Sequence, residues 1–449
     1  STDITLHIMD YVPELGTKVM VKIYGLGGLS FDETVDLDAK GSAQFKAPVY
    51  GTSLMSVNIA SLGIYTPTAT IAPEKAVNIY IDPRYSTIPS LKRLGENVPA
   101  QFVFTDGVYS PLDKAKAHCP VEPSIDVSDP IRPTAWKWTS AQFADSIMAE
   151  RKAIAEAIAQ IESDASFHKY LMAELDASTI NAFANASTIF GRSFYSAHPD
   201  FTGHRFMDSI HGMPSAEQFA ALAREINIGA PELLAIPSYA FGVTKIDWSK
   251  YGVENQQVAE VSAYIQAYDK ASEQGSVPDA MAETLQSFPN PFYAEAAEAR
   301  AKVIEAKLKD LSKIKNETPQ VPDDKVFDAI IAPHKGKVVL VDLWNTWCGP
   351  CRRALAANEP LKDGELSSPD IVWIYIADTS SETGSYSTMV PEIRGEHYMV
   401  NASQIKAIRD RFNVDGIPFY ILVDREGNAE GHPDFRDHSA LIEGIKSKL

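Results

Sequence analysis

The first 85 residues follow a strand pattern, in which hydrophobic and polar positions alternate. Ile4, Leu6 and Ile8 show it first, and similar segments return at 19–24, 55–59 and 77–81. Short alternating segments separated by turns predict an antiparallel β-sandwich over residues 1–85. A turn sequence at 38–41 predicts a hairpin between the segments on either side of it. No catalytic constellation appears there, so we interpret this region as an accessory or interaction module.

Residues 86–318 begin irregularly and then change to a helical pattern. Several prolines between 111 and 133 predict a loop. From Ser140, hydrophobic residues such as Phe143 and Ile147 recur at helical spacing. Further helices are predicted near 166–187, 214–226, 254–272 and 291–315, followed by a linker at 316–322. The middle region is therefore expected to be mainly helical.

Residues 320–449 alternate strands with helices, which predicts an α/β domain with a central sheet. The strand segments are 337–344, 371–378 and 419–423, and the helical segments are 402–412 and a closing one from about Ser439. A loop is expected around 388–397. A turn at 424–428 predicts that an antiparallel hairpin completes the sheet.

Two cysteines, Cys348 and Cys351, follow the strand at 337–344, where the chain is expected to turn into a helix. Unpaired N–H groups and the helix dipole at a helix N-terminus stabilise a thiolate, so the pair is suited to redox chemistry. The alternatives are structural thiols or half of a zinc site. Zinc needs further ligands, and the one other cysteine, Cys119, is far away in sequence. We therefore predict a redox-active disulfide and no metal.

The length and charge of the chain exclude some classes of function. A chain of 449 residues predicts two or three domains. The net charge of -18 argues against nucleic acid or an anionic membrane as the main partner. No apolar run approaches 18 residues, so no transmembrane segment is expected. Because the chain begins at Ser1 without methionine, we expect a leader, with or without a lipid anchor, to have been removed.

Two other groups of side chains are candidates for a site. His198, His204 and His211 lie close together in sequence, with acidic residues between them. Nearby glycines and prolines favour a surface loop, and the spacing fits no familiar metal site. Cys119 follows His118, but a lone cysteine is more often a buried structural thiol than a reactive one.

The third region resembles the thioredoxin fold, and in particular the thioredoxin-like thiol–disulfide oxidoreductases of the TlpA/ResA type. The resemblance rests on residues 338–351, on Gly416-Ile417-Pro418 and on residues 422–427. It covers about the last 130 residues of the chain. The β and helical regions that precede it resemble those of larger members from the envelope of Gram-negative bacteria, in which an accessory β domain precedes the redox domain.

The resemblance implies roles for individual residues. Cys348 would attack a target disulfide, and Cys351 would resolve the mixed disulfide. Pro418 would be the family's cis-proline beside the dithiol, and the Ile417 backbone would pair with an incoming peptide. The substrate-binding surface would consist of Trp347, Gly349, Pro350, Ile417 and Pro418.

Asp342 precedes Cys348 by six residues, where thioredoxins carry a buried acid. The resemblance implies that it accepts the proton of Cys351, and burial would raise its pKa toward neutrality. Many TlpA/ResA-type proteins have asparagine at this position. Those that serve cytochrome c maturation have glutamate where this chain has Ala354, which argues against a dedicated cytochrome role. A short helix near 325–331 is expected in place of the family's hairpin before the first strand.

Gly349-Pro350 between the cysteines and Ile417 before the proline are the choices found in reducing thioredoxins. We therefore expect a protein-disulfide reductase of the periplasm or cell envelope of a Gram-negative bacterium. Its partners would be a disulfide-containing protein and an upstream thiol donor, and no cofactor is expected. The alternatives are a disulfide isomerase or oxidase, or a partner-binding protein in which the dithiol is secondary.

Overall fold

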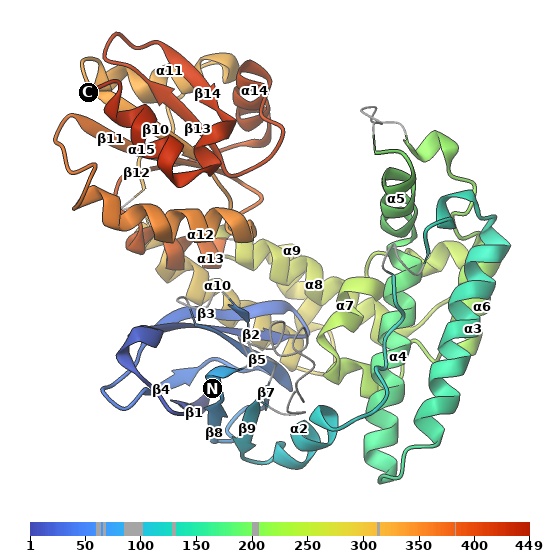
Figure 1. The fold of residues 1–449 in the computed structure, drawn as a ribbon. Coiled ribbons are helices and arrows are strands. Elements are labelled where there is room, and N and C mark those ends of the chain that lie inside the picture. Colours follow the sequence, from blue (N-terminus) through green and yellow to red (C-terminus); the bar gives the residue numbers. More distant parts are fainter. Residues whose placement is uncertain are drawn as a thin grey trace, which may run out of the picture. The chain divides into compact units, whose positions relative to one another are not determined.

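The structure is a computed structural model. It describes residues 1–59, 64–65, 69–84, 102–127, 132–199, 206–311, 315–381 and 383–449. The chain divides into two compact units (Figure 1). Unit 1 comprises Ser1–Asp269 and Val277–Glu298, and unit 2 comprises Lys270–Ser276 and Ala299–Leu449. This division differs from the three regions expected from the sequence, because the N-terminal sheets and most of the helical residues before Ala299 share unit 1.

The N-terminal part of unit 1 contains two sheets around one hydrophobic core. The first has the order β4-β1-β8-β9, and the second has the order β3-β2-β5-β6, with β7 paired to β5. Inward-facing residues of both sheets, such as Leu6 and Val21, form one buried cluster. The strands are β1 Thr2–Ile8, β2 Lys18–Gly25, β3 Gly28–Asp36, β4 Ser42–Ala47, β5 Ser53–Ile59, β6 Ile64–Tyr65, β7 Ala69–Ile71, β8 Val77–Ile81 and β9 Val103–Asp106.

Three details of these sheets differ from the expectation. The pair β1–β8 is parallel, so the first sheet is mixed rather than antiparallel. Strand β9 adds to β8 and extends the sheet beyond residue 85. The turn at 38–41 exists, with the Asp38 carboxylate accepting from the Lys40 and Ser42 N–H groups. The predicted hairpin is wrong, however, because β3 pairs with β2 and β4 pairs with β1.

The rest of unit 1 is mainly helical, as expected. Capping boxes at Thr139 and Ser215 begin α3 and α6. Helix α2 lies in the segment expected to be a loop. Pro111 is tolerated there because it lies in the first turn. The helices that lie wholly or partly in unit 1 are α2 Ser110–Ala117, α3 Ser140–Ala159, α4 Ala165–Ala184, α5 Ala186–Ala197, α6 Ala216–Glu225, α7 Pro237–Val243, α8 Gln256–Gln274, α9 Asp279–Gln286 and α10 Phe292–Leu311. The end of α8 from Lys270 and the part of α10 from Ala299 belong to unit 2.

The main part of unit 2 is a thioredoxin fold. Its sheet has the order β12-β11-β10-β13-β14, with β10, β11 and β12 parallel and β13 and β14 antiparallel to their neighbours. The elements are α11 Val326–Ile331, β10 Val338–Leu343, α12 Gly349–Asn358, β11 Ile371–Asp378, α13 Thr383–Met389, β12 Glu396–Val400, α14 Ala402–Phe412, β13 Phe419–Val423, β14 Ala429–His432 and α15 His438–Lys446. The expected short helix before β10 is present as α11, whereas α13 ends and β12 begins within the segment 388–397 expected as a loop.

Helices cover both faces of this sheet. Side chains of α12, α13 and α15 pack with Leu340, Tyr375 and Tyr420 on one face. Side chains of α11 and α14 pack with Val341 and other strand residues on the opposite face. All six residues of β10 are buried, as expected for a central strand between two helical layers. The chain therefore passes from the C-terminal end of β10 to the face of the sheet that α12 covers.

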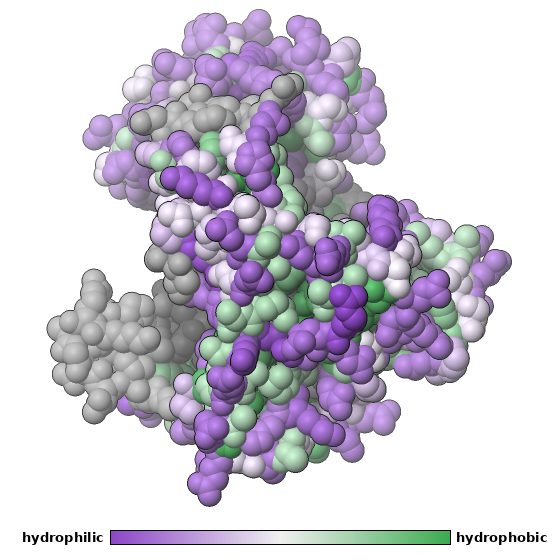
Figure 2. Space-filling model, turned by 90° about the vertical axis from the view of Figure 1, so that its right-hand side faces the viewer, coloured by the Kyte–Doolittle hydropathy of each residue, from purple (hydrophilic) through white to green (hydrophobic). Residues whose placement is uncertain are grey.

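The outer face of the helical part of unit 1 is mixed in character. Figure 2 shows hydrophilic residues interspersed with smaller groups of hydrophobic residues over the side on which α3 lies. None of the helices in the described ranges combines the length and hydrophobicity that crossing a bilayer requires.

Candidate active site

The cysteine pair lies at the start of α12, immediately after the central strand. Cys348 is the N-cap residue, and Cys351 lies in the first helical turn. They form a disulfide with a Cα–Cα distance of 5.3 Å. The Cys348 N–H donates to the Asn345 carbonyl oxygen at 3.0 Å, which closes the turn between strand and helix. The predicted redox pair is therefore close enough to open and close a disulfide.

The helix start favours negative charge on Cys348. The Cys351 N–H points at the Cys348 Sγ atom, with an N–S distance of 3.2 Å. This N–H is one of those left without a carbonyl partner at a helix N-terminus, and the helix dipole adds to its effect. Cys348 is 5% exposed and Cys351 is fully buried. Of the two cysteines, the one that keeps some exposure is thus also the one whose thiolate the helix stabilises.

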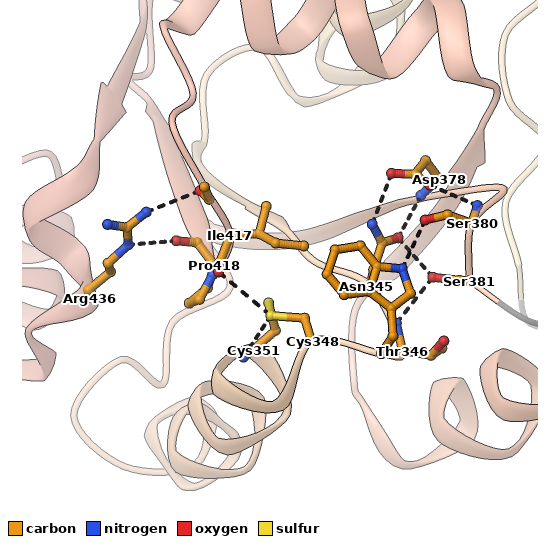
Figure 3. Close-up of a disulfide and its surroundings, with 12 residues drawn as sticks. Asn345, Thr346, Cys348, Cys351, Asp378, Ser380, Ser381, Ile417, Pro418 and Arg436 are labelled. Carbon is orange, nitrogen blue, oxygen red and sulfur yellow. Dashed lines mark hydrogen bonds between the residues drawn. A yellow bond between two sulfur atoms is a disulfide. The ribbon is translucent and has the colours of Figure 1, made fainter. Parts of the chain in front are cut away.

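The loop that contains Ile417 and Pro418 lies against the disulfide (Figure 3). The Ile417–Pro418 peptide bond is cis. The Cys348 Sγ atom is 3.6 Å from the Ile417 carbonyl oxygen. Arg436, which the sequence analysis missed, donates to the carbonyl oxygens of Gly416 and Pro418 at 3.1 and 3.0 Å. An arginine from the segment before α15 therefore holds both sides of the loop that borders the cysteines.

The remaining residues of the expected substrate-binding surface lie next to the pair. Gly349 and Pro350 form the first two positions of α12, and Pro350 is exposed. Trp347 is 62% exposed, and its Nε1–H donates to the Ser380 hydroxyl at 2.9 Å. The exposed indole is a flat apolar surface beside the disulfide.

A polar network that the sequence analysis missed supports this segment. The buried Asn345 accepts from the Asp378 N–H at 3.0 Å and from the Ser381 hydroxyl at 2.8 Å, and it donates to the Asp378 carboxylate at 2.9 Å. The Thr346 N–H donates to the Ser381 hydroxyl (Figure 3). The loop after β11 is thereby fixed to the residues just before Cys348. The signal in the sequence was an asparagine and a threonine at the end of an apolar strand, where polar side chains need partners.

Asp342 is buried within the sheet, as the sequence predicted. It is 2% exposed, and neither carboxylate oxygen has a hydrogen-bond partner within the described part of the chain. The strand register places Tyr375 and Tyr420 on either side of it. Both tyrosines belong to the cluster that contains Cys351, so Asp342 lies on the sheet face covered by α12.

Burial raises the pKa of Asp342 to about 8, and the positive charge of Lys362 opposes this rise. The Lys362 Nζ atom lies 4.9 Å from the centre of the Tyr375 ring. A carboxyl group that is charged only near or above neutral pH can exchange a proton with a thiol, whose ordinary pKa is about 8.5. The burial and pKa of Asp342 are therefore compatible with the role that the resemblance implies.

The other candidate groups show no comparable site. His198 bonds to the Phe194 carbonyl oxygen at 2.8 Å, and His204 lies outside the described residues. Cys119 is half-buried, and its Sγ atom is 3.2 Å from the Val121 carbonyl oxygen. Among the described residues, no group of three or more His, Cys, Asp or Glu side chains is placed to hold a metal.

No family model matches the chain. Solved structures match its C-terminal part. A thiol:disulfide interchange protein of the thioredoxin family from Chlorobium tepidum is 22% identical, with a TM-score of 0.24, over 26% of this chain and 83% of that one. A thiol-disulfide oxidoreductase from Bacteroides vulgatus is 26% identical, with a TM-score of 0.23, over the same shares. An exposed lipoprotein thioredoxin from Streptococcus pneumoniae is 18% identical, with a TM-score of 0.22, over 26% and 89%.

This likeness is confined to about a quarter of the chain, and its scores are low. The chemical assignment therefore rests on the site itself. A disulfide at the start of α12, a loop with a cis-proline beside it and a buried acid beneath the helix together form a thioredoxin-like thiol–disulfide oxidoreductase domain.

Proposed function

We propose that this chain reduces disulfides of proteins in the cell envelope of a Gram-negative bacterium, with Cys348 as nucleophile and Cys351 as resolving thiol. The observation that carries the proposal is the Cys351 N–H directed at Cys348 Sγ, at the start of a helix that faces the Ile417 loop. This geometry favours a reactive thiolate next to an edge where an extended peptide can bind.

The reaction begins with both cysteines reduced. The Cys348 thiolate attacks one sulfur of the target disulfide, and the other target sulfur leaves as a thiolate and takes up a proton. Once the Asp342 carboxyl has lost its own proton to solvent, Cys351 gives its proton to the Asp342 carboxylate and attacks Cys348 Sγ. The second target thiol is released, and the Cys348–Cys351 disulfide forms. Two electrons have passed to the target, and an upstream thiol donor must return them.

Trp347, Gly349, Pro350 and the Ile417–Pro418 loop would bind the target. The indole of Trp347 supplies apolar contact area, and the Ile417 backbone supplies hydrogen bonds to an extended segment. Backbone pairing of this kind is tolerant of side-chain identity, which suits an enzyme that acts on several targets.

Reduction of a protein disulfide by the full chain tests the activity. Insulin is a suitable target, with dithiothreitol as donor and the uncatalysed rate subtracted. Cys348→Ser should abolish catalysis. Cys119→Ser is the matched control, because it removes the cysteine outside the pair, and it should leave the rate unchanged. A Cys348→Ser protein that retains the wild-type rate would refute the proposal.

The direction of electron flow needs a separate measurement. Gly349-Pro350 and Ile417 are residues that the resemblance associates with reducing proteins. We expect the pair to equilibrate with glutathione buffers at a potential near that of thioredoxin, about -270 mV, rather than near that of a strong oxidant such as DsbA, about -120 mV. A potential at the oxidising end would favour the oxidase or isomerase alternative.

The envelope location follows from the same chemistry, because protein disulfides persist in oxidising compartments. A thiol reagent that cannot cross the inner membrane should label Cys348 in intact cells with a permeabilised outer membrane. Labelling only after lysis would contradict the location and leave the activity assay unaffected.

A further inference from the structure

Two arginines lie next to two glycines of the site, one that follows Cys348 and one that precedes Ile417. A Cβ atom built on Gly349, the residue after Cys348, would lie 3.8 Å from a terminal nitrogen of Arg353. A Cβ atom built on Gly416, the residue before Ile417, would lie 3.6 Å from a terminal nitrogen of Arg436. One guanidinium therefore lies over the start of α12, and the other lies beside the Ile417 loop.

Both arginines face solvent at this edge. Arg353 is exposed, and the Arg436 side chain is 43% exposed. In Figure 3, Arg436 lies on the far side of Ile417–Pro418 from the disulfide. Its guanidinium also pairs with the Asp415 carboxylate at 3.2 Å, and that carboxylate is itself 74% exposed. An exposed acid can be replaced by an acid of a bound peptide at little cost, because surface ion pairs are weak.

This local positive charge contrasts with the chain as a whole, which has a net charge of -18. The general field of the protein would favour basic peptides, whereas the two guanidinium groups at the edge of the cysteine pair would favour acidic ones. At contact distance the nearby groups prevail, because distant exposed charges are screened beyond about 8 Å at physiological salt.

We propose that the substrates are extended disulfide-containing segments with acidic side chains next to the reactive cysteine, selected by Arg353 and Arg436. This inference rests on the proposed function and adds the substrate class to it. With the peptide paired to the Ile417 backbone, side chains on either side of its cysteine would extend toward the two guanidinium groups.

Three peptides that differ only in the residues flanking one cysteine test the proposal. The cysteine is linked by a disulfide to 2-thiopyridine, which is uncharged, and the flanking residues are glutamate, glutamine or lysine. The reduced full chain attacks the peptide sulfur, and released 2-thiopyridone is measured. Each rate constant is divided by that for dithiothreitol on the same peptide, which removes differences in intrinsic reactivity.

We expect the glutamate peptide to react about 3- to 10-fold faster than the lysine peptide, with glutamine between them, since exposed ion pairs are each worth roughly 1.4- to 5-fold. Arg353→Gln and Arg436→Gln should each reduce this ratio by about 2-fold, within the same range. Asp415→Asn should increase it, because it frees Arg436 without removing that residue's bonds to the loop. Lys406→Gln, on α14 at the opposite face of the sheet, removes the same charge and should leave the ratio unchanged.

The outcomes separate this inference from the proposed function. Dipyridyl disulfide, a small neutral compound without a peptide chain, should react with the wild type, with Asp415→Asn and with Lys406→Gln at the same rate, and this reaction requires only Cys348. A wild-type protein that does not react with it contradicts the proposed function. If it reacts but the glutamate-to-lysine ratio is 1 or less, or is unchanged in Arg353→Gln and Asp415→Asn, the inference is wrong. A uniform loss for all peptides and for dipyridyl disulfide in Arg353→Gln would show that this arginine acts on the Cys348 thiolate instead.

Discussion

Replacing Asp342 with asparagine should stabilise unit 2, and the gain should grow with pH. The pKa of the Asp342 carboxyl is raised from 3.8 to about 8 by burial. The unfolded chain therefore loses this proton near pH 4, whereas the folded protein keeps it until about pH 8. Between these values folding takes up a proton, so the folded state becomes less stable as the pH rises.

The size of the gain in the free energy of unfolding follows from the pH range between these two pKa values. One pKa unit corresponds to about 1.4 kcal/mol, so the cost of the buried carboxyl reaches roughly 4 kcal/mol at pH 7. Asparagine has nearly the same shape and carries no charge. Asp342→Asn should thus equal the wild type near pH 4 and exceed its free energy of unfolding by roughly 4 kcal/mol at pH 7.

Hydrogen exchange of β10 and β13 peptides in increasing urea measures this in the oxidised full chain, because it reports unit 2 separately from unit 1. Asp363→Asn is a matched control: its carboxylate is exposed, and Arg394 lowers its pKa, so this change should give no gain above pH 4. A difference between wild type and Asp342→Asn that stays constant from pH 4 to 8 would refute the reasoning, because it would mean that the carboxyl titrates alike in both states.

Three further changes test the site. Cys351→Ser should accumulate a mixed disulfide through Cys348 with a target protein, detected by mass spectrometry; accumulation in Cys348→Ser instead would reverse the assigned roles. Lys362→Met should raise the pKa of Asp342, because it removes the positive charge that lowers it. In the same exchange experiment, the loss of stability with rising pH should then continue to a higher pH. If it ends at the same pH as in the wild type, Lys362 does not affect the acidity of Asp342. Asn345→Ala should lower the free energy of unfolding by about 1–3 kcal/mol in urea titrations, because buried groups lose their partners; an unaffected stability would show that water replaces the amide.

The cysteine pair and the strand before it could be predicted because their signals are local. All residues of 338–343 are buried, and the motif begins five residues after that strand ends. Strand β12 was missed because Glu396 and His397 interrupt the apolar pattern. Its formation depends on parallel pairing with β11, and His397 is accommodated because its ring nitrogen bonds to the Ile393 carbonyl oxygen at 2.7 Å. Tertiary pairing overrides a weak local preference there.

The supporting residues of the site could not be predicted because their contacts are distant in sequence. Asn345 bonds to Ser381 across 36 positions, and Arg436 bonds to Gly416 across 20. Asparagine, serine and arginine occur on any protein surface, and nothing local distinguishes these from others. The prediction of a hairpin around residues 38–41 was wrong for a related reason. Alternation identifies strands, but it does not say which strands pair.

Asp342 shows how register decides what a predicted residue does. The sequence placed an acid in an apolar strand, and its burial followed from that alone. Its neighbours did not: pairing with β11 and β13 sets Tyr375 and Tyr420 beside it, and Lys362 lies over the Tyr375 ring. A shift of one residue in either pairing would turn these phenols to the opposite face of the sheet. The burial that raises the pKa of Asp342 could therefore be predicted from the apolar strand alone, whereas the position of Lys362, whose charge lowers that pKa, could not.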